Sequence, residues 1–386
     1  MRLRTWGMGA LTILAAGAMA LAPTKDEDIE FLKELIRVPS VTDNVPQVNR
    51  AVEVMKTHLE KHGLHCVVEK NAEGRSMLYA STRPGKVQDF LLCSHLDVVN
   101  APADMFEPHF EEGGKWLCGR GAADSKGNCT TISRVLIDLA GKASVGAIFS
   151  TNEEQGGSTC AEMVKRGYGA RKMAIMVDGG SRVILCGQKG SADLLITAHG
   201  RGGHPSDPWD IDNPILKLVD GYQKIHAAYP PWTNNWIEVE CPVWIKGGEE
   251  VGIVPNDAQM ALQIHTTRKN GIAESVEMIQ NLLGKDFEIK ILNQKPPFES
   301  DPSHPLMQSL QAHLREEWKE DPRVGLPFIK ATATTDAVHY SSLGVPVAVT
   351  CNHQRLSHLP GEGVEVNSIG PYAEGLKKFI LDNSDR

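Results

Sequence analysis

The chain has 386 residues, a net charge of -8 and a pI near 6.0. This length exceeds what one hydrophobic core usually supports, so the sequence predicts two domains. Its composition, 41% hydrophobic and 23% charged, is that of an ordinary globular protein. The acidic balance provides no basic patch, and we therefore expect no nucleic-acid partner.

The first 20 residues have the pattern of a secretory signal peptide. Arg2 and Arg4 precede the apolar run from Trp6 to Ala20, which ends in small residues. The alternative is a membrane anchor, but the run is short for a span. We expect cleavage near Ala20, a periplasmic or secreted mature chain, and no stable membrane anchor. Eight scattered cysteines form no C-x-x-C pair and predict no specific disulfide.

The segment from residue 21 to residue 187 reads as a first domain of alternating helices and strands. Helical spacing predicts a helix from Asp26 that ends before Pro39, and a second helix from about Val48 to His62. Strand and helix signals then alternate to about Leu185. This alternation predicts an α/β fold with a mostly parallel sheet and helices on both faces.

The pattern changes after residue 187. The expected elements have the order β-α-β-β-α-β, which is the ferredoxin-like unit. They are strands at 191–198, 236–245, 258–266 and 287–292 and helices at 215–226 and 272–283. We therefore expect an inserted α+β domain over residues 188–296. A helix at 305–317 and a strand at 345–350 then complete a discontinuous first domain of residues 21–187 and 297–386.

Acidic and imidazole side chains follow several of the apolar runs. His95 follows Phe90 to Cys93, Glu153 follows Val145 to Ser150, and Asp178 follows Met173 to Val177. In open α/β sheets, side chains beyond the carboxyl ends of the strands share one crevice. Together with Asp124, Glu154 and His358, these residues make up the set of side chains that a two-metal hydrolase requires.

Each motif taken alone has a plainer interpretation. The pair His95 and Asp97 is as often a satisfied buried pair as a metal ligand with its proton acceptor. Asp124 could cap the following helix, although capping leaves the flanking glycines between Gly119 and Gly127 unexplained.

The remaining acids and His358 have plain alternatives as well. Glu153 and Glu154 could form a solvated acidic turn, Asp178 could be a turn former, and His358 a surface histidine. Two adjacent carboxylates at a strand end can also have different roles, so that one binds a metal and the other accepts and donates a proton. Only the combined order of all these residues favours a metal centre.

These residues together resemble the co-catalytic zinc metallopeptidase family. That family includes glutamate carboxypeptidase, carnosinase-type dipeptidases, aminoacylase, acetylornithine deacetylase and succinyl-diaminopimelate desuccinylase. The match runs from about Ile29 to Ile380. The resemblance implies that His95 and Asp178 bind one metal, that Glu154 and His358 bind the other, and that Asp124 bridges them. It further implies Glu153 as general base, Asp97 as the partner of His95, and a cis peptide between Asp124 and Ser125.

The same resemblance implies two zinc ions, although manganese or cobalt would also suit these ligands. Two cations lower the pKa of a water between them and polarise the substrate carbonyl, while Glu153 takes the water's proton and delivers it to the leaving amine. The loop from Gly200 to Ser206 matches the lid motif whose histidine, here His204, helps hold the oxyanion. A homodimer joined through the lids is implied, although His204 could equally be an ordinary turn residue.

Two departures from the family bear on the substrate. Gly252 to Pro255 lacks the asparagine that often precedes I-P, and Gln263-Ile264-His265 replaces the D-I-R that often binds a carboxylate. Arg268 lies close by in sequence and is a candidate substitute, because a guanidinium suits a carboxylate. The substrate-binding candidates are Arg268, His265, Thr335 and Asp336, the last two in the family's substrate-facing T-D segment. Glu362 fits the family pattern as a support of the metal site.

The function expected from this ligand set is zinc-dependent hydrolysis of the amide bond of a dipeptide or short peptide, by an exopeptidase. Asp at position 178 favours peptides slightly, because the dipeptidase and aminopeptidase branches tend to use Asp there. The alternative is an N-acyl-amino-acid deacylase, such as a deacetylase or desuccinylase. The competing class is a binding protein that has the fold of a hydrolase but no longer catalyses hydrolysis. Such a protein would lack a metal ligand or the general base, and none of these residues is missing.

Overall fold

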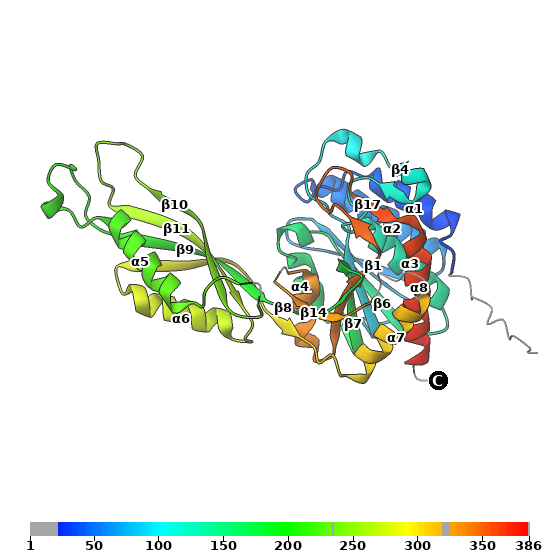
Figure 1. Ribbon diagram of the computed structural model, residues 1–386. Coiled ribbons are helices and arrows are strands. Elements are labelled where there is room, and N and C mark those ends of the chain that lie inside the picture. Colours follow the sequence, from blue (N-terminus) through cyan, green and yellow to red (C-terminus); the bar gives the residue numbers. More distant parts are fainter. Residues whose placement is uncertain (1–21, 234, 319–324, 333, 385–386) are drawn as a thin grey trace, which may run out of the picture.

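A computed structural model describes residues 22–233, 235–318, 325–332 and 334–384. The expected signal peptide, residues 1–20, lies outside the described residues. Figure 1 shows two units: a large α/β unit, and a smaller unit that projects from it beyond β8 (Ile184–Gln188). Within the described ranges, no helix is both long and apolar enough to cross a membrane.

The large unit is built on a central sheet with the strand order β1-β2-β6-β3-β7-β15-β8-β13, with β14 beside β8. Its pairs β6-β3, β3-β7 and β7-β15 are parallel, whereas β1-β2, β2-β6 and β8-β13 are antiparallel. The β15-β8 pair is also antiparallel. The predicted parallel sheet is confirmed for its central strands β6, β3, β7 and β15, and the antiparallel pairs flank them. Its other strands are β1 (His65–Lys70), β2 (Ser76–Ser81), β3 (Val87–His95), β6 (Val145–Ser150), β7 (Gly169–Ser181), β13 (Phe298–Glu299), β14 (Phe328–Ala331) and β15 (Val347–Cys351).

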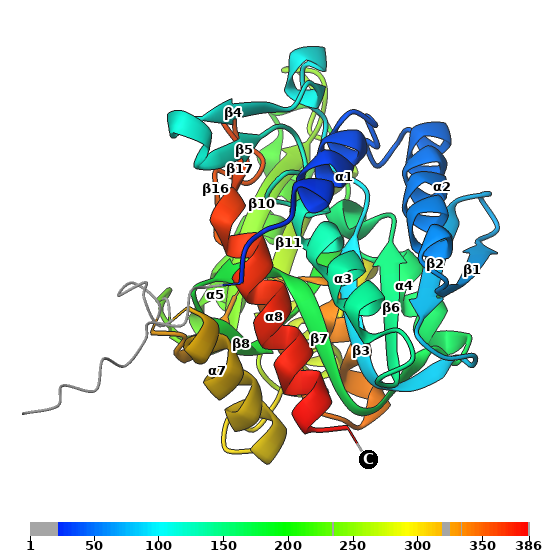
Figure 2. The same cartoon turned by 90° about the vertical axis from the view of Figure 1, so that its right-hand side faces the viewer.

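Helices cover both faces of this sheet (Figure 2). Along β3, Phe90 and Leu92 pack into one apolar core while Leu91 and Cys93 pack into a second core, so both faces of the strand are buried. The helices are α1 (Asp26–Ile36), α2 (Val45–Lys61), α3 (Lys126–Leu139), α4 (Ser158–Lys165), α7 (Pro305–Glu317) and α8 (Val366–Asp382), with short 3-10 turns η1 (Ala103–Phe106), η2 (Glu112–Gly114), η3 (Glu153–Gln155) and η5 (Asp336–Leu343).

The smaller unit, called the small domain below, has the predicted β-α-β-β-α-β order. Its elements are β9 (Gly190–His199), η4 (Pro208–Asp210), α5 (Pro214–Ala228), β10 (Val239–Gly247), β11 (Asp257–Thr266), α6 (Gly271–Leu283) and β12 (Phe287–Lys295). The antiparallel sheet has the order β10-β11-β9-β12. Alternate residues of β9 and β11 pack with the two helices into one core, which leaves the other face of the sheet free of helices.

A third sheet of four short antiparallel strands, in the order β16-β17-β5-β4, was not among the expectations from sequence. Its strands are β4 (His109–Glu111), β5 (Trp116–Cys118), β16 (Gln354–Arg355) and β17 (Gly363–Glu365). Segments of two or three residues are too short to show the alternation that marks a strand. This sheet joins the segment before Asp124 to the segment that carries His358.

Candidate metal centre

The central sheet gathers the predicted ligands at one edge. His95 is the last residue of β3, the η3 turn with Glu153 and Glu154 follows β6, and Asp178 lies near the end of β7. Because β6, β3 and β7 are adjacent parallel strands, their carboxyl ends open onto the same crevice. Asp124 lies in the loop between β5 and α3, and His358 lies between β16 and β17.

Two ligand groups form there, and they share Asp124. The first group is His95, Asp124 and Asp178, and the second is Asp124, Glu154 and His358; within each group the ligand atoms lie within 4.8 Å of one another. Asp124 Oδ1 is 2.9 Å from His95 Nε2, whereas Asp124 Oδ2 is 3.2 Å from His358 Nε2. His358 Nε2 is also 3.1 Å from Glu154 Oε2. The two oxygens of Asp124 therefore face different groups, which is the arrangement that a bridging carboxylate requires.

The chemistry of these side chains fits two divalent cations. Burial raises the pKa of the Asp178 carboxyl to about 7, with the nearby Asp124 charge as the next cause. Burial also raises the pKa of Glu154, whose Oε1 is buried without a hydrogen-bond partner in the described structure. Buried acids that lack positive partners are costly, and bound cations would supply those partners. Imidazole nitrogens and carboxylate oxygens suit zinc.

Asp97 supports the site in a different way from the expected one. His95 Nδ1 is 2.9 Å from the backbone oxygen of Asp97 and 3.5 Å from its carboxylate oxygen Oδ1. The ring proton on Nδ1 is thus donated mainly to the carbonyl, which leaves the lone pair on Nε2 toward Asp124. The carboxylate of Asp97 instead accepts from the backbone N–H groups of Glu153 and Glu154 and from the Thr42 hydroxyl. It therefore orients the acidic turn.

Glu153 lies beside the two ligand groups without belonging to either. Burial raises the pKa of its carboxyl well above the usual range, and the charges of Asp336 and Asp178 raise it further. A carboxylate whose pKa is raised by its surroundings accepts a proton more readily than an ordinary carboxylate, as a general base must.

An ion pair between Arg120 and Glu362 connects the two loops that carry Asp124 and His358. Arg120 Nη1 donates to Glu362 Oε2, and Arg120 Nη2 donates to the backbone oxygen of His358 at 3.1 Å. Glu362 Oε1 accepts three backbone N–H groups, from Gly121, Ala123 and Asp124. Glu362 was expected to support the site, whereas its partner Arg120, 242 residues away in sequence, was not expected. The peptide between Asp124 and Ser125 is cis, as the resemblance implied.

The substrate-binding candidates lie in two places, with Thr335 and Asp336 in the large unit and Arg268 in the small domain. Asp336 is 1% exposed and its Oδ2 accepts from Ser150 Oγ at 2.6 Å, while Thr335 donates to Gln188. Asp336 is therefore buried close to Glu153 and Asp178, whereas Thr335 is half-buried. A role of either residue in substrate binding stays a prediction. Arg268, in the small domain, is held by ion pairs with Glu238 and Glu274.

His204 lies on an exposed loop of the small domain. Its Nδ1 is 2.6 Å from Ser206 Oγ, and within the described residues neither ligand group includes it. Its role toward a partner subunit stays a prediction.

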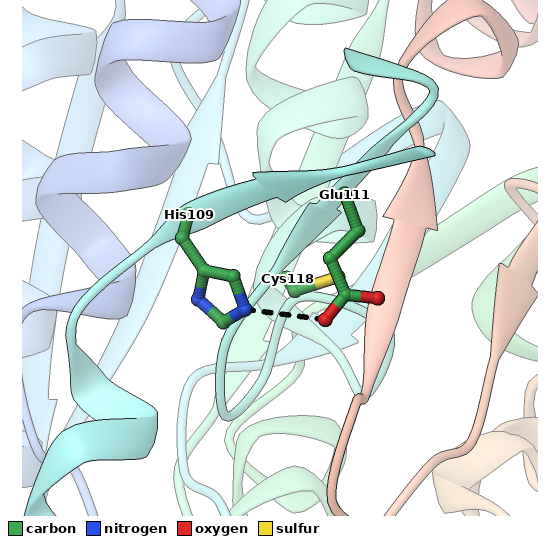
Figure 3. Close-up of side chains that lie close together, drawn as sticks. All are labelled: His109, Glu111 and Cys118. Carbon is green, nitrogen blue, oxygen red and sulfur yellow. Dashed lines mark hydrogen bonds and ion pairs between the residues drawn. The ribbon is translucent and has the colours of Figure 1, made fainter. Parts of the chain in front are cut away.

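A third group of metal-ligand types, on β4 and β5, was not predicted (Figure 3). His109 Nε2 lies 3.3 Å from Glu111 Oε1, and Cys118 lies within reach of both. The guanidinium of Arg355, however, binds Glu111 Oε2 and lies 3.6 Å from Cys118 Sγ. A cation therefore already neutralises this group, and we assign no metal to it. None of the eight cysteines forms a disulfide.

An α/β fold that presents shared carboxylate and imidazole ligands at the ends of its parallel strands defines a metal-dependent hydrolase. The chain belongs to the peptidase family M20/M25/M40, whose model matches residues 91–382. It is 25% identical over 384 residues to a succinyl-diaminopimelate desuccinylase of Wolbachia pipientis subsp. Culex pipiens, covering 92% of this chain and 93% of that protein. It is also 28% identical over 262 residues to a probable carboxypeptidase of Aspergillus clavatus, covering 61% of each chain.

Solved structures share the fold of this chain. A tripeptidase of Staphylococcus aureus superposes with a TM-score of 0.78 at 15% identity, covering 94% of this chain and 99% of that one. An M20 family metallo-carboxypeptidase of Sulfolobus solfataricus superposes with a TM-score of 0.74 at 15% identity, covering 92% and 99%. Family membership and fold therefore agree with the resemblance drawn from the motifs.

Proposed function

We propose that this enzyme uses two divalent cations, zinc in the first instance, to hydrolyse the amide bond of an N-acyl amino acid. The observation that carries the proposal is the pair of ligand groups that share Asp124. The succinyl-diaminopimelate desuccinylases among the sequence relatives favour this acyl substrate class over the dipeptide expected first.

His95 and Asp178 would hold one cation, Glu154 and His358 the other, with Asp124 between them. When bound, two such cations lower the pKa of a water and polarise the substrate carbonyl. Glu153 would accept the proton from that water and deliver it to the leaving nitrogen, because burial raises the pKa of its carboxyl and makes it a better proton acceptor than an ordinary carboxylate. Asp97 keeps Glu153 in place through the backbone of the η3 turn.

A dipeptide or short peptide is the second candidate substrate. One observation favours it: Asp178 occupies the position at which the peptide-cleaving branches of the family tend to carry aspartate. Both substrate classes contain an amide beside an amino acid carboxylate, so the same reaction serves either. Relative rates on the two classes decide between them.

We also propose that the mature chain is exported and that it forms a homodimer through the small domain. The basic and apolar pattern of residues 1–20 supports export. Strand β10 is an edge of the small-domain sheet and carries three exposed apolar side chains, Val243, Trp244 and Ile245, which supports association there. Light scattering on purified protein tests the dimer, and N-terminal sequencing of the protein expressed in a Gram-negative host tests cleavage.

The test of function measures hydrolysis of acetylated amino acids, succinylated amino acids and dipeptides, each with and without a chelator. We expect turnover of acylated amino acids that stops on chelation and returns with zinc. Glu153→Gln should lower kcat by about 100- to 10,000-fold while the protein keeps its metal. The exposed Glu73→Gln substitution is the control and should leave kcat unchanged. Undiminished turnover by Glu153→Gln would contradict the proposed role of Glu153 as general base.

A further inference from the structure

Asp336 is a buried carboxylate that contacts the chain on both sides of the turn that carries Glu153. Its Oδ2 accepts from the hydroxyl of Ser150 at 2.6 Å, and Ser150 is the last residue of β6, ahead of the turn. Its Oδ1 lies against Gly157, which follows the turn, because a Cβ added to Gly157 would be 1.8 Å from this oxygen. One side chain, 1% exposed, therefore connects the segments that enter and leave the η3 turn.

His339 holds the same end of the turn beside Asp336. Its Nε2 is 3.4 Å from the backbone oxygen of Gly156 and 3.9 Å from Asp336 Oδ1. Both of these oxygens are acceptors, so the ring proton belongs on Nε2 and points toward them. The η5 turn therefore contacts the segment after Glu153 through two neighbouring side chains.

The η5 turn that carries Asp336 and His339 is itself fixed by apolar packing. Ala337, Val338 and Tyr340 are fully buried in the second core of the large unit. A packed core does not deform to follow a moving loop, because its side chains already fill the space around them. Asp336 thus has a fixed position from which it can hold the η3 turn.

The carboxylate of Asp336 is not fully satisfied by the fold around it. Its Oδ1 is buried and has no hydrogen-bond partner among the described residues. An unsatisfied buried group is costly, and proteins keep such groups mainly where a function requires the geometry. Burial raises the pKa of the Glu153 carboxyl, and the Asp336 charge raises it further, so the two carboxyls lie close together.

We propose that Asp336 is a positioning residue, which keeps Glu153 in place for proton transfer by holding both sides of its turn. The inference rests on the proposed role of Glu153 as general base. Asp97 holds the backbone N–H groups of Glu153 and Glu154, and Asp336 holds the segment that follows them. A displacement of a reacting group by about 1 Å can lower a rate by about 100-fold. Because Asp336 acts through the turn and not on the substrate, its loss changes kcat rather than KM.

The experiment combines Asp336→Ala with Glu153→Gln in a double-mutant cycle on N-acetyl amino acids. We expect Asp336→Ala to lower kcat about 10- to 100-fold with little change in KM. In the Glu153→Gln background the same substitution should have almost no further effect, because the group that Asp336 positions has already been removed. Asp336→Asn keeps the shape and an acceptor for Ser150, so it should recover most of the lost kcat. Thermal melting and zinc content establish that each variant folds and keeps its metal.

A second variant and a matched control accompany this cycle. Ser150→Ala removes one of the two contacts of Asp336 and should lower kcat about 3- to 10-fold, but not in the Glu153→Gln background. It provides the same test if Asp336→Ala does not fold. The control is Asp301→Ala, because Asp301 also accepts from a serine hydroxyl, that of Ser303 at 2.8 Å, but is exposed. It should leave kcat unchanged in both backgrounds.

Three results of these assays would overturn the proposal. An equal loss of kcat from Asp336→Ala with and without Glu153 would show that Asp336 acts independently of the general base. A raised KM at unchanged kcat would show that Asp336 contacts the substrate instead. An Asp336→Asn variant as slow as Asp336→Ala would show that the charge of Asp336, and not its hold on the turn, is what matters.

Hydrogen exchange of the backbone amides of residues 151–157 gives a readout that does not depend on turnover. We expect faster exchange in Asp336→Ala and wild-type exchange in Asp336→Asn and Asp301→Ala. Unchanged exchange in Asp336→Ala would reject the positioning role even if turnover fell. Faster exchange in Asp336→Ala, combined with a wild type that cleaves none of the acylated amino acids or dipeptides, would reject the proposed function and leave the hold of Asp336 on the turn intact.

Discussion

Arg120 and Glu362 form a buried ion pair that connects the loop of Asp124 with the loop of His358. The side chain of Arg120 is 4% exposed and that of Glu362 is fully buried. Glu362 also accepts the backbone N–H group of Asp124 itself at 3.1 Å. The position of the shared ligand therefore depends on a pair of residues that touch no metal ligand side chain.

Loss of this ion pair should destabilise both the fold and the metal centre. Arg120→Met leaves the Glu362 charge buried without its cation, and we expect the free energy of unfolding to fall by about 3 kcal/mol. Metal affinity should fall by about 10- to 100-fold, as is typical when a support of a ligand is removed. Urea unfolding and zinc titration measure the two effects. The control is Lys56→Met, which breaks a more exposed pair with Glu53 and should cost less than about 1 kcal/mol.

The shared position of Asp124 predicts an unequal loss of metal among ligand variants. Asp178→Asn and His358→Gln each damage one group and should leave about one tightly bound zinc per chain, whereas Asp124→Asn damages both and should leave almost none. Atomic emission on dialysed protein measures the ratio of zinc to chain. His109→Gln is the control, because Arg355 already neutralises that group, and it should keep the wild-type content. Equal zinc contents in all three ligand variants would contradict a bridging Asp124.

Gly157 should tolerate no side chain. It has a φ of +71°, and an added Cβ would lie 1.8 Å from Asp336 Oδ1 and 2.8 Å from His339 Nε2. Gly157→Ala must displace the loop after Glu153, so we expect kcat to fall together with thermal stability. Gly63 is a matched control, because its φ is +78° and nothing lies within 4 Å of an added Cβ. Gly63→Ala carries only the backbone strain of about 1 kcal/mol and should leave kcat unchanged. Equal effects of the two substitutions would show that strain alone is responsible.

His58 predicts a pH dependence of stability that is separate from the metal centre. Burial, followed by the charges of His62 and Lys61, lowers the pKa of this ring to about 4 from 6.5, and the ring stacks on Phe31. Because the unfolded chain binds the proton more readily, stability falls as pH drops from 6.5 toward 4 and rises in the opposite direction. Denaturant unfolding across this range should be less pH-dependent for His58→Gln than for the wild type. The exposed His65→Gln substitution should leave the wild-type slope unchanged.

Local patterns in the sequence were enough to predict the main elements and the ligand inventory. The predicted helix at 305–317 is α7, and the predicted order of elements in the small domain is the one observed. These predictions worked because apolar periodicity and capping act over a few residues and are readable in any segment. Parallel strands also place their carboxyl ends at one edge, so His95, Glu153 and Asp178 could be expected to meet before the fold was known.

Only the tertiary structure decided which distant side chains pair with one another. The Arg120 partner of Glu362 and the backbone contacts of Asp97 both depend on loops that lie far apart in sequence. A single sequence contains no local signal for such pairing, because the contact energy exists only once the segments have been brought together. The sequence by itself therefore determined the kind of chemistry, and the packing of strands and loops decided which residues support it.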